Sequence, residues 1–466
     1  MIKYDCSNIH SKIIGEEHGL NLEEKFDEYS LTIKEIINDI KIEKDFPNSN
    51  LNWINFYKEK ENLNDIKEYA KRVEGKFENI FIIGLSAPLY GAKAIFSAIT
   101  GPYWNHFSRE KRENTPQIYF LNNIDPDNVN ALFQTTDLRR TLVVVVSKYG
   151  QTPETTALFM YAKKMLENEI GENYPLHIVT CCHHDSILAQ ISKEEGYYTF
   201  DYPENINGRL GTFSHCGLLP LILAGINIDE LLEGVEEATE NLLNPGIHEN
   251  IAAQDAIIHY LAYTEKQKTI SVLLPYADRL KWIPDLYIQL NAECLNRRCD
   301  INGKAVQTGQ MSVYTNEIVD QPTLMQSFIE GPNDKIIDIL QVEKPSNDCI
   351  IPKLFKYTGI GYLGGKSFTQ LINADIIALT SVLSDNNRPC TILSLPEISP
   401  FYMGNLLTFL FIKTIISAKL YNTVPLGEIS PENTSDYFFA LMGQNGYEET
   451  ARELKEKLAQ RNAAIL

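Results

Sequence analysis

Four consecutive valines, Val143 to Val146, constrain the fold more than any other stretch of the 466-residue chain. β-Branched side chains favour strands, and an unbroken apolar run of this length is typical of a strand buried on both faces of a parallel sheet. After a short turn, Pro153 begins an apolar-periodic run that indicates a helix. Strand, turn and helix in this order predict an α/β fold whose parallel sheet is flanked by helices.

The same alternation of strand and helix patterns recurs along the chain. A strand–turn–helix unit is predicted at residues 79–99, whereas the segment 375–384 fits a strand and a helix equally well. Further strands are predicted at residues 117–123, 175–182, 196–203, 268–276 and 389–398.

These patterns form two similar halves, which a Pro- and Gly-containing loop at residues 244–250 separates. The chain ends in an amphipathic pattern that is typical of a helix packing on a neighbour. The predicted domains are an N-terminal helical segment (1–75), a first α/β half (76–245), a second α/β half (246–420) and a C-terminal helical arm (421–466).

Composition favours a soluble globular protein, because 44% of the residues are hydrophobic and no uninterrupted apolar run approaches 20 residues. The chain opens without the apolar segment of a signal peptide. The eight cysteines have neither the spacing of a disulfide scaffold nor that of a paired zinc site, which indicates reduced thiols and a cytoplasmic location. A formal net charge of −19 would repel nucleic acid, so neither nucleic acid nor a membrane is an expected partner.

The turn after the valine strand has the features of an anion site. The N-terminus of the following helix offers free N–H groups, and Ser147, Thr152 and Thr155 add hydroxyls. An ordinary capping turn, with Thr152 as N-cap and Pro153 at the first helical position, explains the local sequence equally well. The turn after the preceding strand, GLSAPLYG at residues 84–91, lacks the glycine spacing of a dinucleotide-binding loop.

Five segments carry a resemblance to a known family: FIIGLSAPLYGAKA, VVVVSKYGQTPET, NINGRLGTFSHCGLLPLILAGINIDELLEG, YIQLNAEC and TLMQSFIEGP. In order and spacing they resemble the glucose-6-phosphate isomerase family, in its shorter bacterial form, from about Phe26 to the C-terminal FALMGQNGYEE. The resemblance implies two sugar-isomerase (SIS) domains, each a parallel sheet flanked by helices, plus a C-terminal helical arm. It also implies a homodimer whose site lies across the subunit interface, and a reaction without metal or organic cofactor.

The resemblance gives the valine turn a function. Ser147, Lys148 and Thr152 match the family loop that binds the 6-phosphate of the substrate. Tyr149 and Gln151 stand where that loop has hydroxyl residues. We therefore expect a sugar-phosphate site with fewer hydroxyl donors than its relatives have.

For the isomerisation itself, Glu293 matches the family's catalytic base and Arg209 matches the arginine that stabilises the enediolate. Gln289 matches a substrate-binding position, and Gly84 and Gly208 complete the expected binding residues. A spacing of four residues places Gln289 and Glu293 on one helix face. Without the resemblance, an exposed helical glutamate and a surface or salt-bridging arginine would be the preferred interpretations.

Two active-site residues of the family are missing. Pro322 stands at the position of the ring-opening histidine, and proline can neither donate nor accept a side-chain proton. No lysine occurs between Lys419 and Lys455, where the family has its C-terminal active-site lysine, and Asp436 falls near that place. The first loop carries Ser-Ala-Pro at residues 86–88 instead of the family's Gly-Gly-Ser.

The expected activity is interconversion of glucose 6-phosphate and fructose 6-phosphate through a 1,2-enediol. Slow turnover is expected because ring opening lacks its usual acid and base, for which Tyr314, Asp320 and Asp436 are the candidate substitutes. The alternative is a non-catalytic sugar-phosphate-binding protein, that is, a pseudoenzyme or sensor.

Overall fold

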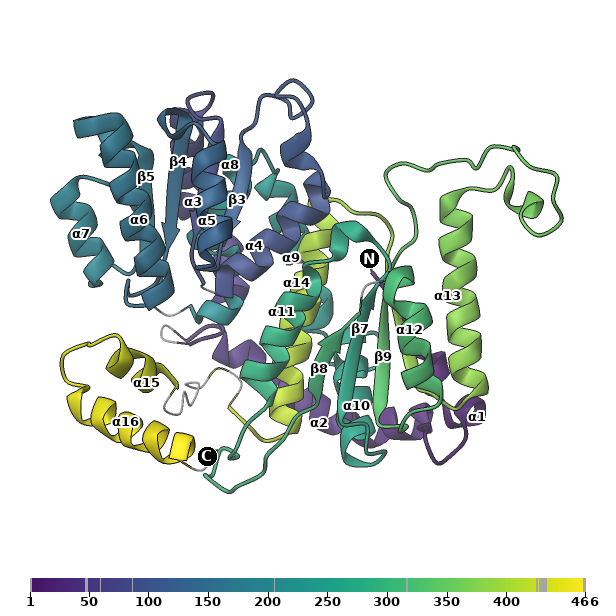
Figure 1. The fold of residues 1–466 in the computed structure, drawn as a ribbon. Coiled ribbons are helices and arrows are strands. Elements are labelled where there is room, and N and C mark those ends of the chain that lie inside the picture. The colour runs from purple at the N-terminus through teal and green to yellow at the C-terminus, as the bar shows by residue number, and fades with distance from the viewer. Residues whose placement is uncertain are drawn as a thin grey trace. The chain divides into compact units, whose positions relative to one another are not determined.

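The computed structural model describes residues 2–46, 49–58, 60–85, 87–204, 206–315, 317–424, 426 and 434–463. It divides the chain into two units, residues 1–426 and 427–466. The larger unit contains two five-stranded sheets (Figure 1). The described part of the smaller unit is helical, with α15 (Thr434–Leu441) and α16 (Glu448–Ala463).

The first sheet is entirely parallel, with the strand order β3-β2-β4-β5-β6. Its strands are β2 (Asn79–Ile83), β3 (Gln117–Leu121), β4 (Thr141–Val146), β5 (Ile178–Cys182) and β6 (Tyr198–Asp201). Its helices are α3 (Lys60–Val73), α4 (Ala87–Thr100), α5 (Pro126–Thr135), α6 (Pro153–Ile170), α7 (Ile187–Glu195) and α8 (His215–Leu223).

The valine strand lies at the centre of this sheet, as the sequence predicts. All six residues of β4 are buried. Val144 and Val146 pack into the large core shared with α4 and α8, whereas Val143 and Val145 pack into a second core on the other face with residues of α5, α6 and α7. Helices therefore cover both faces of the strand, which explains its uniform apolar sequence.

The second sheet has the order β1-β10-β9-β7-β8, and its strands are parallel except for β1, which runs antiparallel to β10. Its strands are β1 (Lys3–Asp5), β7 (Ile270–Pro275), β8 (Met311–Tyr314), β9 (Lys335–Val342) and β10 (Cys390–Leu395). The fold is thus α/β with two mainly parallel sheets, as predicted.

Three details differ from the sequence analysis. The ambiguous segment 375–384 belongs to helix α13 (Phe368–Asp385). The N-terminal segment, predicted to be helical, also supplies β1 to the edge of the second sheet. Strands β8 and β9 went unrecognised because β8 is only four residues long and half-exposed, and because Asp338 interrupts the apolar run of β9.

The larger unit has further α-helices beside those already named. They are α1 (Ser11–Ile14), α2 (Leu22–Glu43), α9 (Ile228–Leu242), α10 (Ile251–Thr264), α11 (Ile283–Leu290), α12 (Glu317–Ile329) and α14 (Pro400–Leu420). Helix α11 follows β7 and packs on α4, so it links the second sheet to the first (Figure 1).

Helix α14 is the central helix of the larger unit. Among the described helices it is the one long and apolar enough to cross a membrane, but 89% of its most apolar window is buried inside the protein. It approaches α9 closely, because a Cβ at Gly234 would lie 2.0 Å from the Phe401 carbonyl oxygen and one at Gly404 would lie 2.2 Å from that of Leu231. Within this structure α14 is a core helix.

A buried charge cluster joins α10, α14 and the second sheet. Asp255 and His259 lie one turn apart on α10, Asp338 lies on β9 and Lys413 lies on α14. Lys413 forms an ion pair with Asp255, and His259 Nε2 lies 3.2 Å from Asp338 Oδ1 and 3.4 Å from Asp255 Oδ1. Two cations therefore balance two carboxylates in a site that is closed to solvent.

Four hydroxyl groups complete the hydrogen bonding of the two carboxylates. The Tyr4 hydroxyl of β1 donates to Asp255 over 2.6 Å. Asp338 accepts from Ser271 of β7 (3.1 Å), Tyr287 of α11 (3.3 Å) and Thr391 of β10 (2.9 Å). The cluster therefore cross-links four strands of the sheet, β1, β10, β9 and β7, to the helices α10, α11 and α14.

The protonation of His259 should make the stability of the fold depend on pH. Burial opposes the charged imidazole and so does Lys413, but the carboxylates of Asp338 and Asp255 outweigh them and hold the pKa of His259 well above its ordinary value. Above about pH 6.5 the unfolded chain loses this proton while the folded chain keeps it. The free energy of unfolding should therefore fall with rising pH, by up to about 1.4 kcal/mol per pH unit, until the raised pKa is reached.

Urea unfolding between pH 6.5 and 8 measures this dependence, below the range where buried thiols such as Cys294 contribute to it. His259→Gln should flatten it, because the variant carries no titrating imidazole in the cluster. His106→Gln, which removes an exposed imidazole, is the matched control and should leave it unchanged. If the free energy of unfolding fell with pH equally steeply in both variants, His259 would not be the group responsible for the dependence.

Candidate active site

The first part of the site lies at the carboxyl end of β4, where α6 begins. Ser147 is buried, and its Oγ accepts a hydrogen bond from the Gly150 N–H over 3.1 Å, which closes a tight turn. Thr152 is the N-cap of α6 and Pro153 its first residue, as the sequence suggests, but the exposed Thr152 side chain caps no N–H in the described structure. The capping alternative thus explains the backbone of this turn and leaves the Thr152 hydroxyl available.

The loop after β2 lies against the same turn. A Cβ at Gly84 would lie 2.6 Å from the Val146 carbonyl oxygen, so only glycine allows the ends of β2 and β4 to approach this closely. The Leu85 N–H donates to Thr155 Oγ1 of α6 over 3.3 Å. Both loops therefore meet at the carboxyl ends of β2 and β4. Open α/β sheets bind ligands at this end of their strands.

Lys148 connects this turn to the segment that precedes Arg209. Its ammonium group donates to the carbonyl oxygens of Glu204 (2.9 Å) and Ile206 (3.5 Å). Asn207 Oδ1 then accepts from the Arg209 N–H over 3.1 Å, at the start of a 3₁₀ turn (Gly208–Phe213). Lys148 thus makes a structural contact that connects the turn after β4 to the segment before Arg209.

Glu293, Arg209 and Gln289 meet in the second part of the site. Arg209 Nε donates to Glu293 Oε2 over 2.7 Å, and Gln289 Nε2 donates to Glu293 Oε1 over 3.2 Å. The Arg209 side chain is 8% exposed and that of Glu293 is 27% exposed. Both oxygens of the carboxylate are therefore held, and the carboxylate keeps access to solvent.

The backbone around Glu293 is a π-helical turn (Asn291–Leu295) that continues α11. Such turns are rare and frequently occur at functional sites. Asn291 Nδ2 anchors this turn by donating to Ser312 Oγ of β8 over 2.7 Å. Gln289 Oε1 is buried and accepts no hydrogen bond in the described structure, which marks a place for a donor group.

Glu293 has titratable neighbours in Cys294, Arg209 and Arg297. Burial, only partly opposed by Arg209, raises the pKa of the Cys294 thiol to about 12, so this group is neutral at physiological pH. Burial and the adjacent Arg209 lower the pKa of Arg297, but an arginine remains protonated. The guanidinium groups of Arg209 and Arg297 thus both lie within electrostatic reach of Glu293.

The structure also shows where the substituted positions lie. Pro322 lies exposed within α12, and the half-buried Asp320 lies on the same helix. Tyr314 ends β8 and is 44% exposed. Asp436 is exposed on α15 of the separate C-terminal unit, and Ser86 lies outside the described residues.

Sequence reasoning missed two residues of this site. Arg297 lies four residues after Glu293, a helical spacing that could have signalled a second cation near the carboxylate. Tyr90 of α4 is a further neighbour, because burial, Asp285 and Glu293 raise the pKa of its hydroxyl. No sequence pattern connects Tyr90 to residues two hundred positions away.

Comparisons with known proteins show which family the chain resembles. Residues 92–426 match the phosphoglucose isomerase family. The chain is 32% identical to the glucose-6-phosphate isomerase of Carboxydothermus hydrogenoformans, over 85% of this chain and 86% of that protein. It is 31% identical to a probable glucose-6-phosphate isomerase of Methanococcus maripaludis, over 77% of this chain and 76% of that protein.

Two solved structures share the fold over most of their length. A hypothetical protein of Thermus thermophilus superimposes with a TM-score of 0.81 at 26% identity, covering 98% of this chain and 100% of that one. A glucose-6-phosphate isomerase of Chlamydia trachomatis superimposes with a TM-score of 0.79 at 20% identity, covering 94% and 88%.

The tight turn at Gly150 should control anion binding at the carboxyl end of β4. Gly150 has φ +70°, and a Cβ there would lie 2.7 Å from Leu188 Cβ and 2.9 Å from the Leu188 nitrogen. Gly150→Ala should therefore displace the turn and weaken the binding of inorganic phosphate about tenfold by isothermal titration calorimetry, which corresponds to about 1.4 kcal/mol.

Gly171→Ala is the matched control for this experiment. Gly171 has nearly the same φ, +71°, but a Cβ there would meet no described atom within 4 Å. The control should lose stability through its backbone conformation and keep its phosphate affinity. Unchanged phosphate affinity in Gly150→Ala would show that the turn takes no part in anion binding.

Proposed function

The chain belongs to the phosphoglucose isomerase family, and from this premise we propose that it interconverts glucose 6-phosphate and fructose 6-phosphate. The observation that carries the proposal is the contact of Arg209 with Glu293, because the two residues that the isomerisation requires lie 2.7 Å apart on segments 84 positions apart in sequence. The reaction moves one proton between C1 and C2 of the open sugar through an enediol.

Glu293 is the proposed base of this step. Its carboxylate is oriented by hydrogen bonds to both oxygens and remains partly open to solvent. A positioned base of this kind removes the C2 proton and returns it to C1. Removing the proton places negative charge on the enediol oxygens, and Arg209 and Arg297 supply the positive charge that stabilises it.

Gln289 and the β4 turn are the proposed binding groups. Gln289 Oε1 is a buried acceptor that lacks a donor among the described residues, and a sugar hydroxyl would satisfy it. Ser147, Lys148 and Thr152 are the proposed phosphate contacts, together with the free N–H groups at the start of α6. Gly84 and Gly208 are proposed to let the backbone lie close to the sugar.

The proposal includes slow turnover. Pro322 cannot take part in ring opening, and the position of the C-terminal lysine falls near Asp436. General acid–base assistance is worth about a hundredfold to ten-thousandfold, so kcat should be lower by a comparable factor if ring opening becomes limiting. The Carboxydothermus hydrogenoformans relative is the reference for this comparison in the same assay.

Glu293→Gln should abolish the remaining turnover. Glutamine preserves the shape of the side chain but cannot accept the C2 proton, so a loss of at least about a hundredfold in kcat is expected. A coupled assay starting from fructose 6-phosphate measures it. Glu172→Gln, an exposed glutamate with no described partner, is the matched control. Full activity in Glu293→Gln would show that another residue is the base.

We also propose a cytoplasmic homodimer. The supporting observation is an apolar segment between β9 and α13, whose large side chains lie open to solvent in the single chain. Exposed apolar surface of this kind commonly marks a protein interface. Its exposed side chains are Ile350, Leu354, Phe355, Tyr357, Ile360 and Tyr362.

The dimer should depend on this segment. Light scattering after size exclusion should give twice the chain mass at micromolar concentration. Replacing Phe355 and Tyr357 by serine should shift the protein to a monomer, because these side chains are 59% and 74% exposed in the single chain. Tyr103→Ser, at an aromatic residue that is 68% exposed elsewhere, should leave the dimer intact. A monomeric unmodified protein would refute the proposal.

A further inference from the structure

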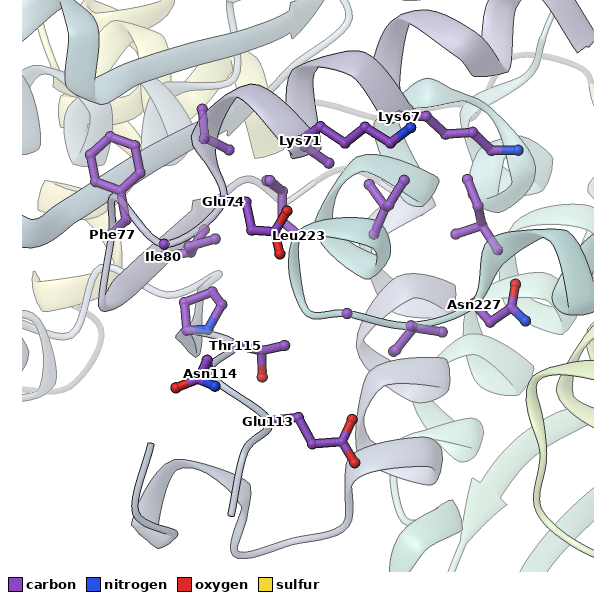
Figure 2. A pocket seen from close by; sticks show the side chains of 18 of the residues that line it. Lys67, Lys71, Glu74, Phe77, Ile80, Glu113, Asn114, Thr115, Leu223 and Asn227 are labelled. Atoms are coloured by element: carbon purple, nitrogen blue, oxygen red, sulfur yellow. The ribbon is translucent and has the colours of Figure 1, made fainter. Parts of the chain in front are cut away.

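A cavity lies at the amino ends of strands in the first sheet, whereas the candidate active site begins at their carboxyl ends. It has a volume of about 680 Å³, which falls in the range of small-molecule sites. Its walls are the end of α3, the segment 113–116 before β3, and the turn between α8 and α9 (Figure 2). Since Phe77 and residues 113–116 precede β2 and β3, the cavity lies at the amino ends of these strands.

The floor of the cavity is apolar. Phe77, Ile80 and Leu223 lie at its base and are themselves buried. Ala70, Val73, Pro116, Ile222, Ile226 and Ile228 extend the same apolar lining. An apolar molecule or group would lose its contact with water here, which favours binding.

One wall is held in an unusual backbone conformation. Glu113 and Asn114 are consecutive non-glycine residues with φ +53° and +65°. The buried Arg112 fixes this segment, because its guanidinium donates to the carbonyl oxygens of Thr115 (3.2 Å) and Phe107. Thr115 Oγ1 donates back to the Arg112 carbonyl over 2.5 Å. The wall is therefore preorganised, and it presents Glu113 to the cavity.

The charges of the lining do not cancel. Lys67 forms an ion pair with Asp229, so these two residues neutralise each other. Glu74, Glu113 and Lys71 have no ion-pair partner among the described residues, which leaves two carboxylates against one ammonium group. Figure 2 shows Glu74 and Glu113 well apart, on opposite sides of the cavity that both residues line.

We propose that this cavity binds an organic cation, a molecule with an apolar body and an ammonium group. The apolar body lies against the buried lining residues Phe77 and Leu223, and the ammonium group lies at the exposed side of the cavity, where Glu74 and Glu113 supply negative charge. The site is separate from the proposed sugar-phosphate site, because the two occupy opposite ends of the same strands. Both ligands can therefore be bound at the same time.

Three probes with a similar apolar body and different head groups test the proposal: 2-phenylethylamine, 2-phenylethanol and 3-phenylpropanoate. Calorimetric or NMR titration of the full chain should show that the amine binds about three- to tenfold more tightly than the alcohol, as expected for two partly exposed ion pairs. The carboxylate should bind more weakly than the alcohol. Saturating fructose 6-phosphate should not displace the amine.

The double variant Glu74→Gln/Glu113→Gln should remove the preference for the amine over the alcohol. Both residues are exposed, so the fold should persist. Glu68→Gln/Glu110→Gln is the matched control, because it makes the same charge change on the same two segments outside the cavity. This control should keep the preference, which excludes an effect of net charge alone.

Three results would overturn the proposal. The first is an amine affinity no greater than that of the alcohol. The second is tighter binding of the carboxylate, which would mean that Lys71 governs the site. The third is displacement of the amine by fructose 6-phosphate, which would place the amine in the active site. Since binding is measured without turnover, a failure here is distinct from a failure of the proposed isomerase activity.

Discussion

The buried charge cluster of Asp255, His259, Asp338 and Lys413 is the interaction on which the larger unit depends. It lies where α10 and α14 cross the second sheet, and its two carboxylates and two cations satisfy one another in the absence of solvent. Removing one member of such a cluster leaves an uncompensated buried charge, which costs about 3–5 kcal/mol. The spacing of Asp255, His259 and Asp338 would suit a metal ion, but the Lys413 ammonium already supplies the compensating positive charge.

This cluster also determines the position of the candidate base. Tyr287 of α11 donates to Asp338, and its hydroxyl lies 2.5 Å from Ser271 Oγ of β7. Gln289 and Glu293 follow on the same helix and its π-helical extension. The helix is thus fixed to the sheet at Tyr287, its π-helical extension is fixed at Asn291, and Glu293 within that extension contacts Arg209. The contact between Arg209 and Glu293 then joins the two sheets, because Arg209 belongs to the segment that follows β6.

The sequence could predict what depends on local pattern. The valine run of β4, the turn after it and the start of α6 at Pro153 follow from β-branching, turn chemistry and helix-start signals. The cluster could not be predicted, since Tyr4, Asp255 and Asp338 are separated by long stretches of chain and Asp338 interrupts an apolar strand. The roles of Glu293 and Arg209 came from the family resemblance. Their spacing alone would have suggested ordinary surface residues, and only the fold shows that they touch.

The net charge of −19 and an anionic substrate are compatible because the two act over different distances. At physiological ionic strength, charges more than about 8 Å apart are largely screened, so the global field affects mainly the approach of a sugar phosphate. Within the site, the partly desolvated charges of Arg209, Arg297 and Glu293 interact at short range. The cavity at the amino ends of the strands has Glu74 and Glu113 in excess over Lys71. The two proposed ligands, at opposite ends of the strands of one parallel sheet, therefore carry opposite charge, and local side chains set this difference independently of the charge of the whole chain.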